Sequence, residues 1–360
     1  MVKTVSVESF LSFGHLKQFG LEPINVLIGP NGSGKSNFVE IFAFMRESPA
    51  DVLKSLVQSG GFRDFVRKPT LDPQALFKAT IELTDRVEHN LVIERSPTDG
   101  LRIFAEQIRR GENGWREFPE EFDLESWDRK KSALAQFRDP QRFPGIQRLL
   151  KFYDSLAIYR RWTFGPDSLT RDRVSLDQRS DALAEDGSNL GLVLQKLWTS
   201  GSEELIRARL AEFLPDVVEP HFGHDPTWLE WGLRMQSGSV ISARRLSDGT
   251  LRWLTLLCIC LNPAPPELVC IEEPELGLHP DMMRTLAELL QDASTRGQVI
   301  VTSHSQGLVA AFSDRPEAIV VCEMHEGKTS MRRLQPSAIL DDYEDLAMAW
   351  ASGAIGGNRW

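Results

Sequence analysis

The sequence predicts an α/β fold with a mainly parallel central sheet, an antiparallel β meander and an inserted helical lobe. Three observations support this prediction. Short apolar runs alternate with amphipathic helical runs in the first and last parts of the chain, an order typical of parallel sheets. Alternating apolar runs over residues 76–83, 90–96 and 101–108 predict antiparallel strands. Apolar residues spaced three and four apart in the middle of the chain predict helices.

These patterns divide the chain into three parts. Residues 1–114 form the first half of the core, residues 115–238 the helical lobe, and residues 239–360 the second half of the core. Outside the meander, strands are expected at residues 24–30, 268–274, 298–305 and 318–324. Helices are expected at residues 37–45, 131–137, 145–156, 189–198, 203–214 and 282–293.

Composition restricts the class of protein. With 360 residues, 41% hydrophobic and 26% charged, the chain is long enough for two lobes. It begins without the basic and then apolar layout of a secretory signal, and its most apolar run, Leu254–Leu261, is too short to span a membrane. The cysteines lie in apolar runs without paired metal spacing, so we expect buried thiols and a cytoplasmic protein. They are Cys258, Cys260, Cys270 and Cys322.

Charge is unevenly distributed along the chain. The net charge is −10, yet the stretch Arg129–Arg179 carries 12 Lys and Arg against 5 Asp and Glu, which gives +7 and leaves −17 elsewhere. Such a stretch is either a solvated face or a contact surface for nucleic acid. The sequence leaves both interpretations open.

A glycine-rich loop lies between the first buried strand and its helix. The segment Gly29–Ser36 reads GPNGSGKS and matches G-x-x-x-x-G-K-[S/T], the phosphate-binding loop (P-loop) pattern. In such a loop the Lys35 ammonium neutralises β- and γ-phosphate oxygens, and the Ser36 hydroxyl ligates Mg²⁺. The sequence therefore predicts binding of ATP with Mg²⁺. The expected nucleotide-binding residues here are Asn31, Gly32, Ser33, Gly34, Lys35, Ser36 and Asn37.

Two carboxylates and a histidine follow buried strands later in the chain. The segment LVCIEEP delivers Glu272, which can hold Mg²⁺, and Glu273, which can orient or deprotonate the attacking water. His304 follows the next strand and is expected to contact the γ-phosphate and report its presence. The alternative is a pair of surface acids and a structural histidine.

A second candidate anion site lies at residues 246–250, which read LSDGT. Small and acidic residues here predict a helix N-terminus, whose free N–H groups bind anions. The order of P-loop, LSDGT, Glu-Glu-Pro strand, GLHP and strand ending in histidine resembles the motif order of ABC-type ATPase heads. The resemblance is to their RecF/SMC-like, OLD-type branch among bacterial AAA ATPases. It covers most of the chain, including EDGSNL at residues 185–190 and the tail SGAIGGNRW.

This resemblance implies a composite ATP site. In that family two heads dimerise, and the signature loop of each completes the ATP site of the other. Ser247 and Gly249 would then bind the γ-phosphate held by Lys35 of a second copy, and the segment ELGLHP would line the same seam.

The chain departs from the family pattern at three places. Glu272 stands where relatives usually carry Asp and is one methylene longer. The strand expected to lead into the Q-loop carries Arg160 and Arg161 instead of Gln, and Gln58 is the alternative glutamine. The Toprim nuclease and long coiled coils of many relatives have no counterpart in these residues.

Three functions fit these features. The first is an ATP-hydrolysing, ATP-dimerising switch in DNA repair or anti-phage defence, which forms a homodimer and works with a separate effector protein. The second is the nucleotide-binding subunit of a transporter, against which the large basic middle of the chain speaks. The third is a scaffold that binds ATP with negligible turnover, which Glu272 would permit.

Overall fold

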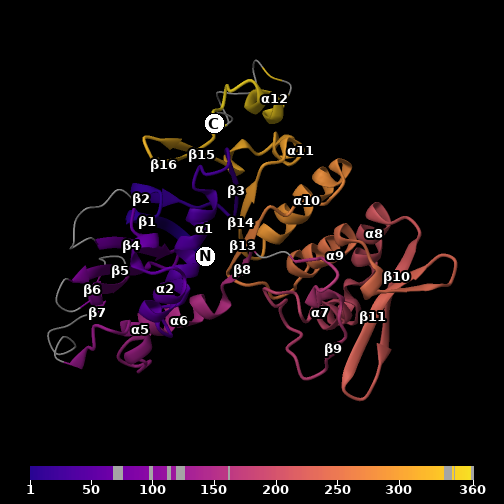
Figure 1. The fold of residues 1–360 in the computed structure, drawn as a ribbon, viewed down its shortest axis with the longest axis horizontal. Coiled ribbons are helices and arrows are strands. Elements are labelled where there is room, and N and C mark those ends of the chain that lie inside the picture. Colours follow the sequence, from indigo (N-terminus) through magenta and orange to yellow (C-terminus); the bar gives the residue numbers. More distant parts are fainter. Residues whose placement is uncertain are drawn as a thin grey trace. The chain divides into compact units, whose positions relative to one another are not determined.

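The computed structural model of the protein describes residues 1–67, 76–96, 100–111, 115–118, 126–160, 163–335, 343 and 345–357. Arg161 and the last three residues of the tail lie outside this described part. The chain forms two compact units, residues 1–156 with 315–360 and residues 157–314 (Figure 1). The division of the sequence into residues 1–114, 115–238 and 239–360 stays a prediction, because it follows sequence pattern whereas the two units are defined by compactness of the fold. Within the described ranges, no helix combines the length and apolar character needed to cross a membrane.

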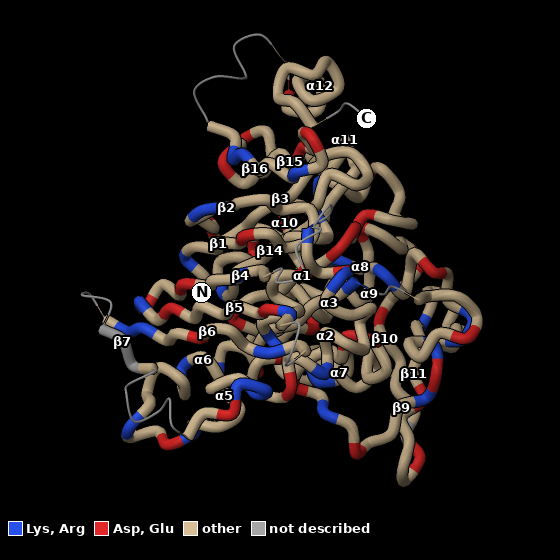
Figure 2. The backbone as a smooth tube through the Cα atoms, turned by 60° about the vertical axis from the view of Figure 1, so that its left-hand side comes forward, with Lys and Arg blue, Asp and Glu red and all other residues tan. Residues whose placement is uncertain are grey.

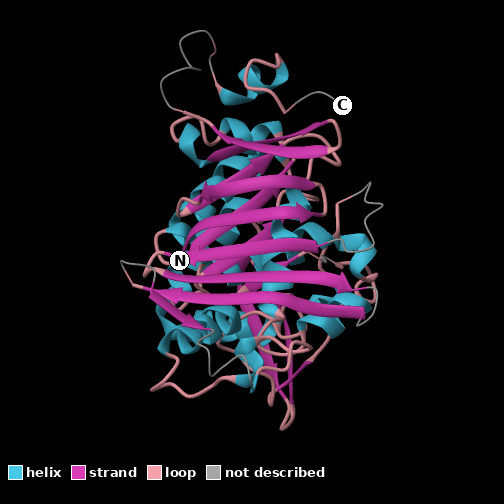
Figure 3. Cartoon of the chain, turned by 90° about the vertical axis from the view of Figure 1, so that its left-hand side faces the viewer, coloured by secondary structure: helices cyan, strands magenta, loops and turns pink. Residues whose placement is uncertain are grey.

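The first unit contains a six-stranded antiparallel sheet in the order β2-β1-β4-β5-β6-β7, whose strands lie side by side in Figure 3. The strands of this sheet are β1 (Val2–Phe10), β2 (Phe13–Gly20), β4 (Leu76–Leu83), β5 (Val87–Ser96), β6 (Gly100–Arg110) and β7 (Trp115–Phe118). Consecutive pairing of β4, β5 and β6 in antiparallel register confirms the predicted meander. The alternation of buried and exposed residues along β4 gives the sheet one apolar face, against which helices of this unit pack.

A second strand group in this unit carries the P-loop. All residues of β3 (Ile24–Ile28) are buried, and β3 pairs in parallel with β15 (Ile319–His325), which pairs antiparallel with β16 (Lys328–Arg333). The predicted strand before the loop and helix after it are confirmed as β3 and α1. The helices among the described residues of this unit are α1 (Lys35–Arg46), α2 (Val52–Gln58), α3 (Phe62–Phe65), α5 (Ala133–Gln136), α6 (Pro144–Ser155), η5 (Pro316–Ala318) and α12 (Leu346–Ala351).

Phenylalanines form the centre of the first unit's core. The rings of Phe10 and Phe77 lie 5.3 Å apart, and those of Phe44 and Phe77 lie 5.2 Å apart, both in edge-to-face arrangement. Phe65 packs on Phe10 at 5.9 Å. Aromatic pairs in this geometry stabilise a core beyond the apolar area that they bury. The cluster therefore joins β1 and β4 of the sheet to α1 and α3.

A buried polar network connects α6 and the start of α5 to the meander. The Tyr153 hydroxyl and His89 Nδ1 lie 2.8 Å apart, and His89 Nε2 lies 2.9 Å from Glu106 Oε1. Glu106 also accepts hydrogen bonds from the Ser132 hydroxyl and the Ala133 N–H. Burial, and then the Glu106 charge, raises the pKa of Tyr153 well above its usual value. Tyr153 therefore stays protonated and donates to Nδ1, while Nε2–H donates to Glu106, so these buried groups are satisfied.

The second unit combines a parallel strand group with a separate antiparallel sheet. Strands β14 (Gln298–Ser303), β13 (Leu268–Glu272) and β8 (Ala157–Tyr159) lie side by side and parallel. In the other sheet, β11 (Trp228–Met235) pairs with β10 (Val217–His224), β12 (Val240–Ser242) and β9 (Val174–Ser175). The helices here are η1 (Leu169–Arg171), α7 (Leu190–Leu197), η2 (Trp198–Ser202), α8 (Glu203–Phe213), η3 (Ala243–Arg245), α9 (Asp248–Cys260), η4 (Pro280–Met282), α10 (Met283–Ser294) and α11 (Gln306–Ala310).

The expectation that residues 115–238 are mostly helical is only partly correct. The four predicted helices are present as α5, α6, α7 and α8, but β10 and β11 form a hairpin that the sequence did not predict. Pro220 and Gly223 interrupt the apolar alternation of β10, and prolines and glycines weaken a strand pattern. The four cysteines are buried free thiols, as predicted, and burial raises the pKa of Cys260 and of Cys322 to about 12.

Truncation of the phenylalanine cluster should destabilise the first unit. Phe10 is fully buried, so Phe10→Ala leaves a cavity in the apolar core. The substitution should lower the free energy of unfolding by about 3–5 kcal/mol. Phe104 on β6 is 46% exposed, and Phe104→Ala should change it by no more than about 0.5 kcal/mol. Urea denaturation monitored by circular dichroism measures both. Equal effects of the two substitutions would contradict this placement of the core.

Candidate functional site

Two glycines of the P-loop occupy positions where a side chain cannot fit. Gly29 has φ +147°, and a Cβ there would lie 2.2 Å from the carbonyl oxygen of Cys322 on β15. Gly34 has φ +99°, and a Cβ there would lie 2.1 Å from Thr329 Oγ1 on β16. The loop is therefore pressed against the β15–β16 hairpin, and only glycine permits this approach.

Lys35 is held inside the loop. Its side chain is buried, and Nζ donates to the carbonyl oxygens of Gly29 at 2.7 Å and Pro30 at 3.0 Å. Ser36 and Asn31 are exposed, whereas Ser33 is buried. The ammonium group is thus placed at the centre of the loop, where phosphate oxygens would replace the carbonyls as its acceptors.

A hydroxyl network supports the loop from behind. Thr329 Oγ1 donates to the Ser33 carbonyl at 3.0 Å and accepts from the Ser12 hydroxyl at 2.6 Å. The Asn37 side-chain amide donates to the Ser12 hydroxyl at 2.7 Å. Asn37, expected to bind nucleotide, thus helps to support the P-loop. Ser12 and Thr329 escaped prediction because no local pattern marks them: they are 317 residues apart.

Glu273 and His304 meet at the carboxyl edge of β13 and β14. The parallel register pairs Glu272 with Thr302, and the Glu273 N–H donates to the Thr302 carbonyl at 2.9 Å. Glu273 Oε1 then lies 3.4 Å from His304 Nε2. Glu273 adopts φ +48°, a left-handed conformation that is costly for a residue with a side chain. The structure brings these two predicted residues together.

Glu275 positions His304, and sequence reasoning did not assign it this role. Its Oε1 accepts from the Ser303 hydroxyl at 2.6 Å and from the His304 N–H at 2.9 Å, and the residue is buried. A carboxylate that accepts two such bonds fixes the backbone at the end of β14. The histidine ring therefore projects from a rigid position.

Glu272 faces an arginine from the neighbouring strand. Because β8 pairs in parallel with β13, Arg160 follows β8 at the same edge, and its Nε lies 3.8 Å from Glu272 Oε1. Arg160 thus lies just after β8, where the family pattern leads to a Q-loop glutamine. Gln58, the alternative glutamine, is exposed at the end of α2 in the other unit.

The signature loop, residues 246–250, begins α9 as predicted. Ser247 is the N-cap, and its hydroxyl accepts from the Thr250 N–H at 3.1 Å. Gly249 packs closely on the segment ELGLHP, since a Cβ there would lie 2.7 Å from the Gly277 carbonyl oxygen. Ser247 and Asp248 are exposed. The structure therefore places the signature loop beside ELGLHP within the second unit, at the positive end of a 13-residue helix.

Arg252 connects the signature helix to Glu273. Its NH1 donates to the Glu273 carbonyl at 2.9 Å, and its guanidinium lies 5.2 Å from the ring centre of Phe164. Burial lowers the pKa of this guanidinium from its usual value, although the nearby acids oppose the shift. The backbone of Glu273 is thus tied to α9 as well as to β14.

The basic stretch Arg129–Arg179 is divided between the two units. Residues 129–156 belong to the first unit and residues 157–179 to the second. Figure 2 shows acidic positions interspersed with basic ones along the chain. Several of the cations already face carboxylates. These pairs are Arg148 with Asp85, Arg160 with Glu272, Arg171 with Asp248 and Arg179 with Asp181.

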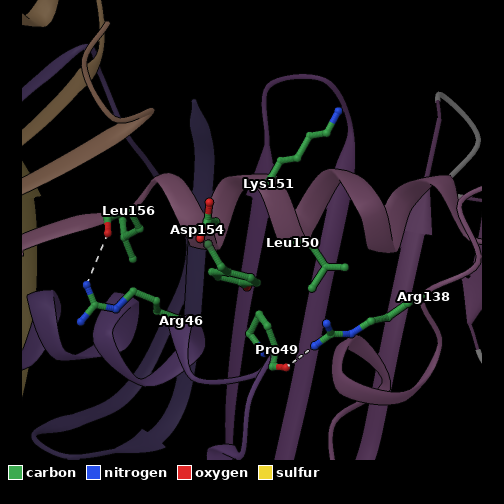
Figure 4. Close-up of a pocket in the computed structure, with 8 residues that line it drawn as sticks. Arg46, Pro49, Arg138, Leu150, Lys151, Asp154 and Leu156 are labelled. Carbon is green, nitrogen blue, oxygen red and sulfur yellow. Dashed lines mark hydrogen bonds between the residues drawn. The ribbon is translucent and has the colours of Figure 1, made fainter. Parts of the chain in front are cut away.

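Part of this stretch borders a groove of about 590 Å³ in the first unit. Arg46 donates to the Leu156 carbonyl at 3.3 Å and Arg138 to the Pro49 carbonyl at 2.8 Å (Figure 4). Lys151 points away from both arginines in this view. The groove is basic, but two of its cations already bind backbone oxygens.

Each unit carries one candidate Mg²⁺ ligand of suitable chemistry, Ser36 in the first and Glu272 in the second. The exposed Ser36 hydroxyl and the half-buried Glu272 carboxylate offer hard oxygen ligands, which Mg²⁺ prefers. Protein sites usually hold Mg²⁺ with one or two such groups plus substrate phosphates. The donor atom of each residue therefore fits the metal in type, and Arg160 is a competing cation at Glu272.

Comparison with known proteins gives a family match and a relative. The profile of the family described as "AAA domain, putative AbiEii toxin, Type IV TA system" matches residues 24–310. The chain is 22% identical to the Old nuclease of Escherichia phage P2 in an alignment that covers 92% of this chain. It spans 61% of that relative's length.

Solved structures of similar fold include heads of SMC proteins. An Smc head bound to the C-winged helix domain of ScpA has a TM-score of 0.59 and 15% identity, over 93% of this chain and 98% of that chain. The Smc head with an extended coiled coil, bound to the C-terminal domain of ScpA and derived from Pyrococcus furiosus, has a TM-score of 0.54 and 13% identity, over 98% of each chain. The predicted fold class, an ABC-type P-loop NTPase head, is confirmed.

Proposed function

The chain belongs to this AAA-domain family, and on that premise we propose that it is an ATP-hydrolysing head that dimerises around two ATP molecules. One observation carries the proposal: Glu273 Oε1 lies 3.4 Å from His304 Nε2, and both side chains are about one-third exposed at the carboxyl edge of parallel strands. A carboxylate that can take a proton from water, beside a ring nitrogen that can donate to a phosphate, suits hydrolysis of ATP.

The P-loop supplies nucleotide binding in this proposal. Lys35 exchanges the carbonyls of Gly29 and Pro30 for phosphate oxygens, because hydrogen bonds between two charged groups are stronger than those to neutral carbonyls. Mg²⁺ bound with the nucleotide would neutralise charge on the β- and γ-phosphates, with Ser36 and Glu272 as the residues that would hold it. Asn31, Gly32, Ser33 and Gly34 offer backbone N–H groups to the phosphates.

The signature loop serves a second copy of the chain in this proposal. Exposed Ser247 and the N–H groups at the start of α9 offer an anion site in addition to the P-loop of the same chain. In this proposal the additional site binds the nucleotide of the second copy. Leu276, next to Gly277 in ELGLHP, is 51% exposed, as expected for an apolar side chain that a second copy covers. The resemblance to SMC heads supports the same arrangement.

Nucleic acid is the proposed target of the switch. The relative from phage P2 is a nuclease, and the basic stretch Arg129–Arg179 exists in an otherwise acidic chain. The switch would then act in repair of DNA or defence against phage, together with an effector protein such as a nuclease. ATP-driven dimerisation would control that effector.

A second candidate is a scaffold that binds ATP and turns over very slowly. The pairing of Glu272 with Arg160 favours it, because a bound cation at this carboxylate competes with Mg²⁺. Measured turnover of the wild-type chain separates the two functions.

Replacement of Glu273 should separate binding from hydrolysis. Glu273→Gln keeps the shape of the side chain but cannot accept a proton, so turnover should fall by roughly 10²–10⁴-fold while ATP binding persists. The variant should accumulate as an ATP-bound dimer, measured by light scattering with and without Mg-ATP. Wild-type turnover in this variant would move the catalytic role elsewhere, with Glu272 the first candidate.

Mixing two inactive variants tests the shared site. Lys35→Ala should lose most of its affinity for Mg-ATP, whereas Ser247→Arg should bind nucleotide but fail to dimerise or turn over. A heterodimer pairs both damaged halves in one site and both intact halves in the other, so ATPase activity should partly return on mixing. If mass spectrometry confirms the heterodimer and no activity returns, the shared site is wrong.

Binding of duplex DNA should depend on salt. If the basic stretch contacts phosphates, the logarithm of the affinity should fall by about 0.9 per log unit of salt for each contact. Fluorescence anisotropy with a labelled duplex at several salt concentrations measures this slope. Absence of binding at low salt, or a flat slope, would make the stretch a solvated face.

A further inference from the structure

Arg171 is the most extensively hydrogen-bonded side chain near the signature loop. It lies on η1, in the middle part of the sequence, yet it reaches residues more than 70 positions away along the chain. Its NH1 donates to the Leu246 carbonyl at 2.6 Å and its NH2 to Asp248 Oδ1 at 2.5 Å. Further acceptors are the carbonyls of Phe164, Gly165, Ala243 and Arg244.

The chemistry of this contact is specific to arginine. The side chain is 8% exposed, so its charge is removed from water and depends on these acceptors. Guanidinium offers five N–H donors in a rigid plane, which can address carbonyls on two segments at once. A lysine would supply the charge, but its single ammonium group could not donate to acceptors on two segments at once. The contact therefore depends on the forked arrangement of N–H donors on the guanidinium, called the fork below.

The acceptors lie on both sides of Ser247. Leu246 precedes it and Asp248 follows it, so one guanidinium fixes the backbone before the N-cap and the side chain after it. Phe164 and Gly165, which follow β8, provide the other anchor of the fork. The direction in which Ser247 and Gly249 face is thereby set by a residue outside the signature loop.

We propose that Arg171 is a positioning residue that orients the signature loop for the ATP bound by a second copy of the chain. The inference rests on the proposed function, because it assigns a purpose to the loop only if the two copies share ATP sites. Arg171 acts through the Leu246 backbone and the Asp248 side chain and does not itself contact nucleotide. Loss of its fork leaves Ser247 present but misdirected.

Replacement of Arg171 should damage the signature loop and spare the P-loop. Arg171→Ala should bind Mg-ATP as the wild type does, and should lose about 10- to 100-fold in ATPase rate and in ATP-dependent dimerisation, as expected when hydrogen bonds to a buried charge are lost. Arg171→Lys should resemble Arg171→Ala, since it keeps the charge without the fork. Arg207→Ala is the matched control, because Arg207 also binds a backbone carbonyl and a carboxylate in this unit and lies outside the site; its activity should match the wild type.

Mixing with Lys35→Ala distinguishes positioning from general unfolding. In the heterodimer one site combines the intact P-loop, Glu273 and His304 of the Arg171→Ala copy with the intact signature loop of the Lys35→Ala copy. Activity should partly return on mixing, as it should for Ser247→Arg. Wild-type turnover of Arg171→Ala alone would overturn the inference. If Ser247→Arg is rescued by Lys35→Ala and Arg171→Ala is not, the inference also fails and the shared site stands. Failure of both mixtures would overturn the proposed function itself.

Discussion

In a parallel pair of strands the register determines which residues meet at the carboxyl edge. Here the register of β13 against β14 places Glu273 and His304 together at that edge. Glu272 stands opposite Thr302, so the chain leaves both strands at the same level, and Glu273 and His304 are the next exposed side chains. A shift by one residue would turn Glu273 to the other face of the sheet. The candidate catalytic pair thus depends on the pairing of two mostly buried strands, and both of its members lie just beyond the ends of those strands.

Other contacts hold this edge in place from several directions. Glu275 fixes the start of the His304 loop, Arg252 fixes the Glu273 carbonyl from α9, and Gly249 packs on the Gly277 carbonyl. The left-handed backbone of Glu273 is sustained by these neighbours, as strained residues at functional sites are. Within the second unit, the candidate catalytic pair and the signature loop are therefore connected by direct contacts.

Sequence reasoning succeeded where chemistry and local pattern coincide. The strands before Gly29, Glu272 and His304, the meander and the cap at Ser247 all follow from short-range rules of periodicity and capping. It failed where the determinant is far away in the chain. Glu275 looks like one more acid in a polar loop until the fold brings it to the His304 N–H.

The same reason explains the other omissions. Arg171 is one basic residue among twelve in its stretch, and only the fold separates it, buried against Leu246 and Asp248, from the solvated cations. The β10 strand was hidden because Pro220 and Gly223 break its alternation, while pairing with β11 forms it regardless. Tertiary hydrogen bonding overrides local propensity at these places.

The central claim is that the signature loop of one copy and the P-loop of another hold the same nucleotide. A structure of the Glu273→Gln variant with Mg-ATP, determined by cryo-electron microscopy or crystallography, tests it most directly. The claim predicts a γ-phosphate contacted by Lys35 of one copy and by Ser247 of the second. A nucleotide held by Lys35 and Ser247 of the same chain, or bound to a single copy, would contradict it.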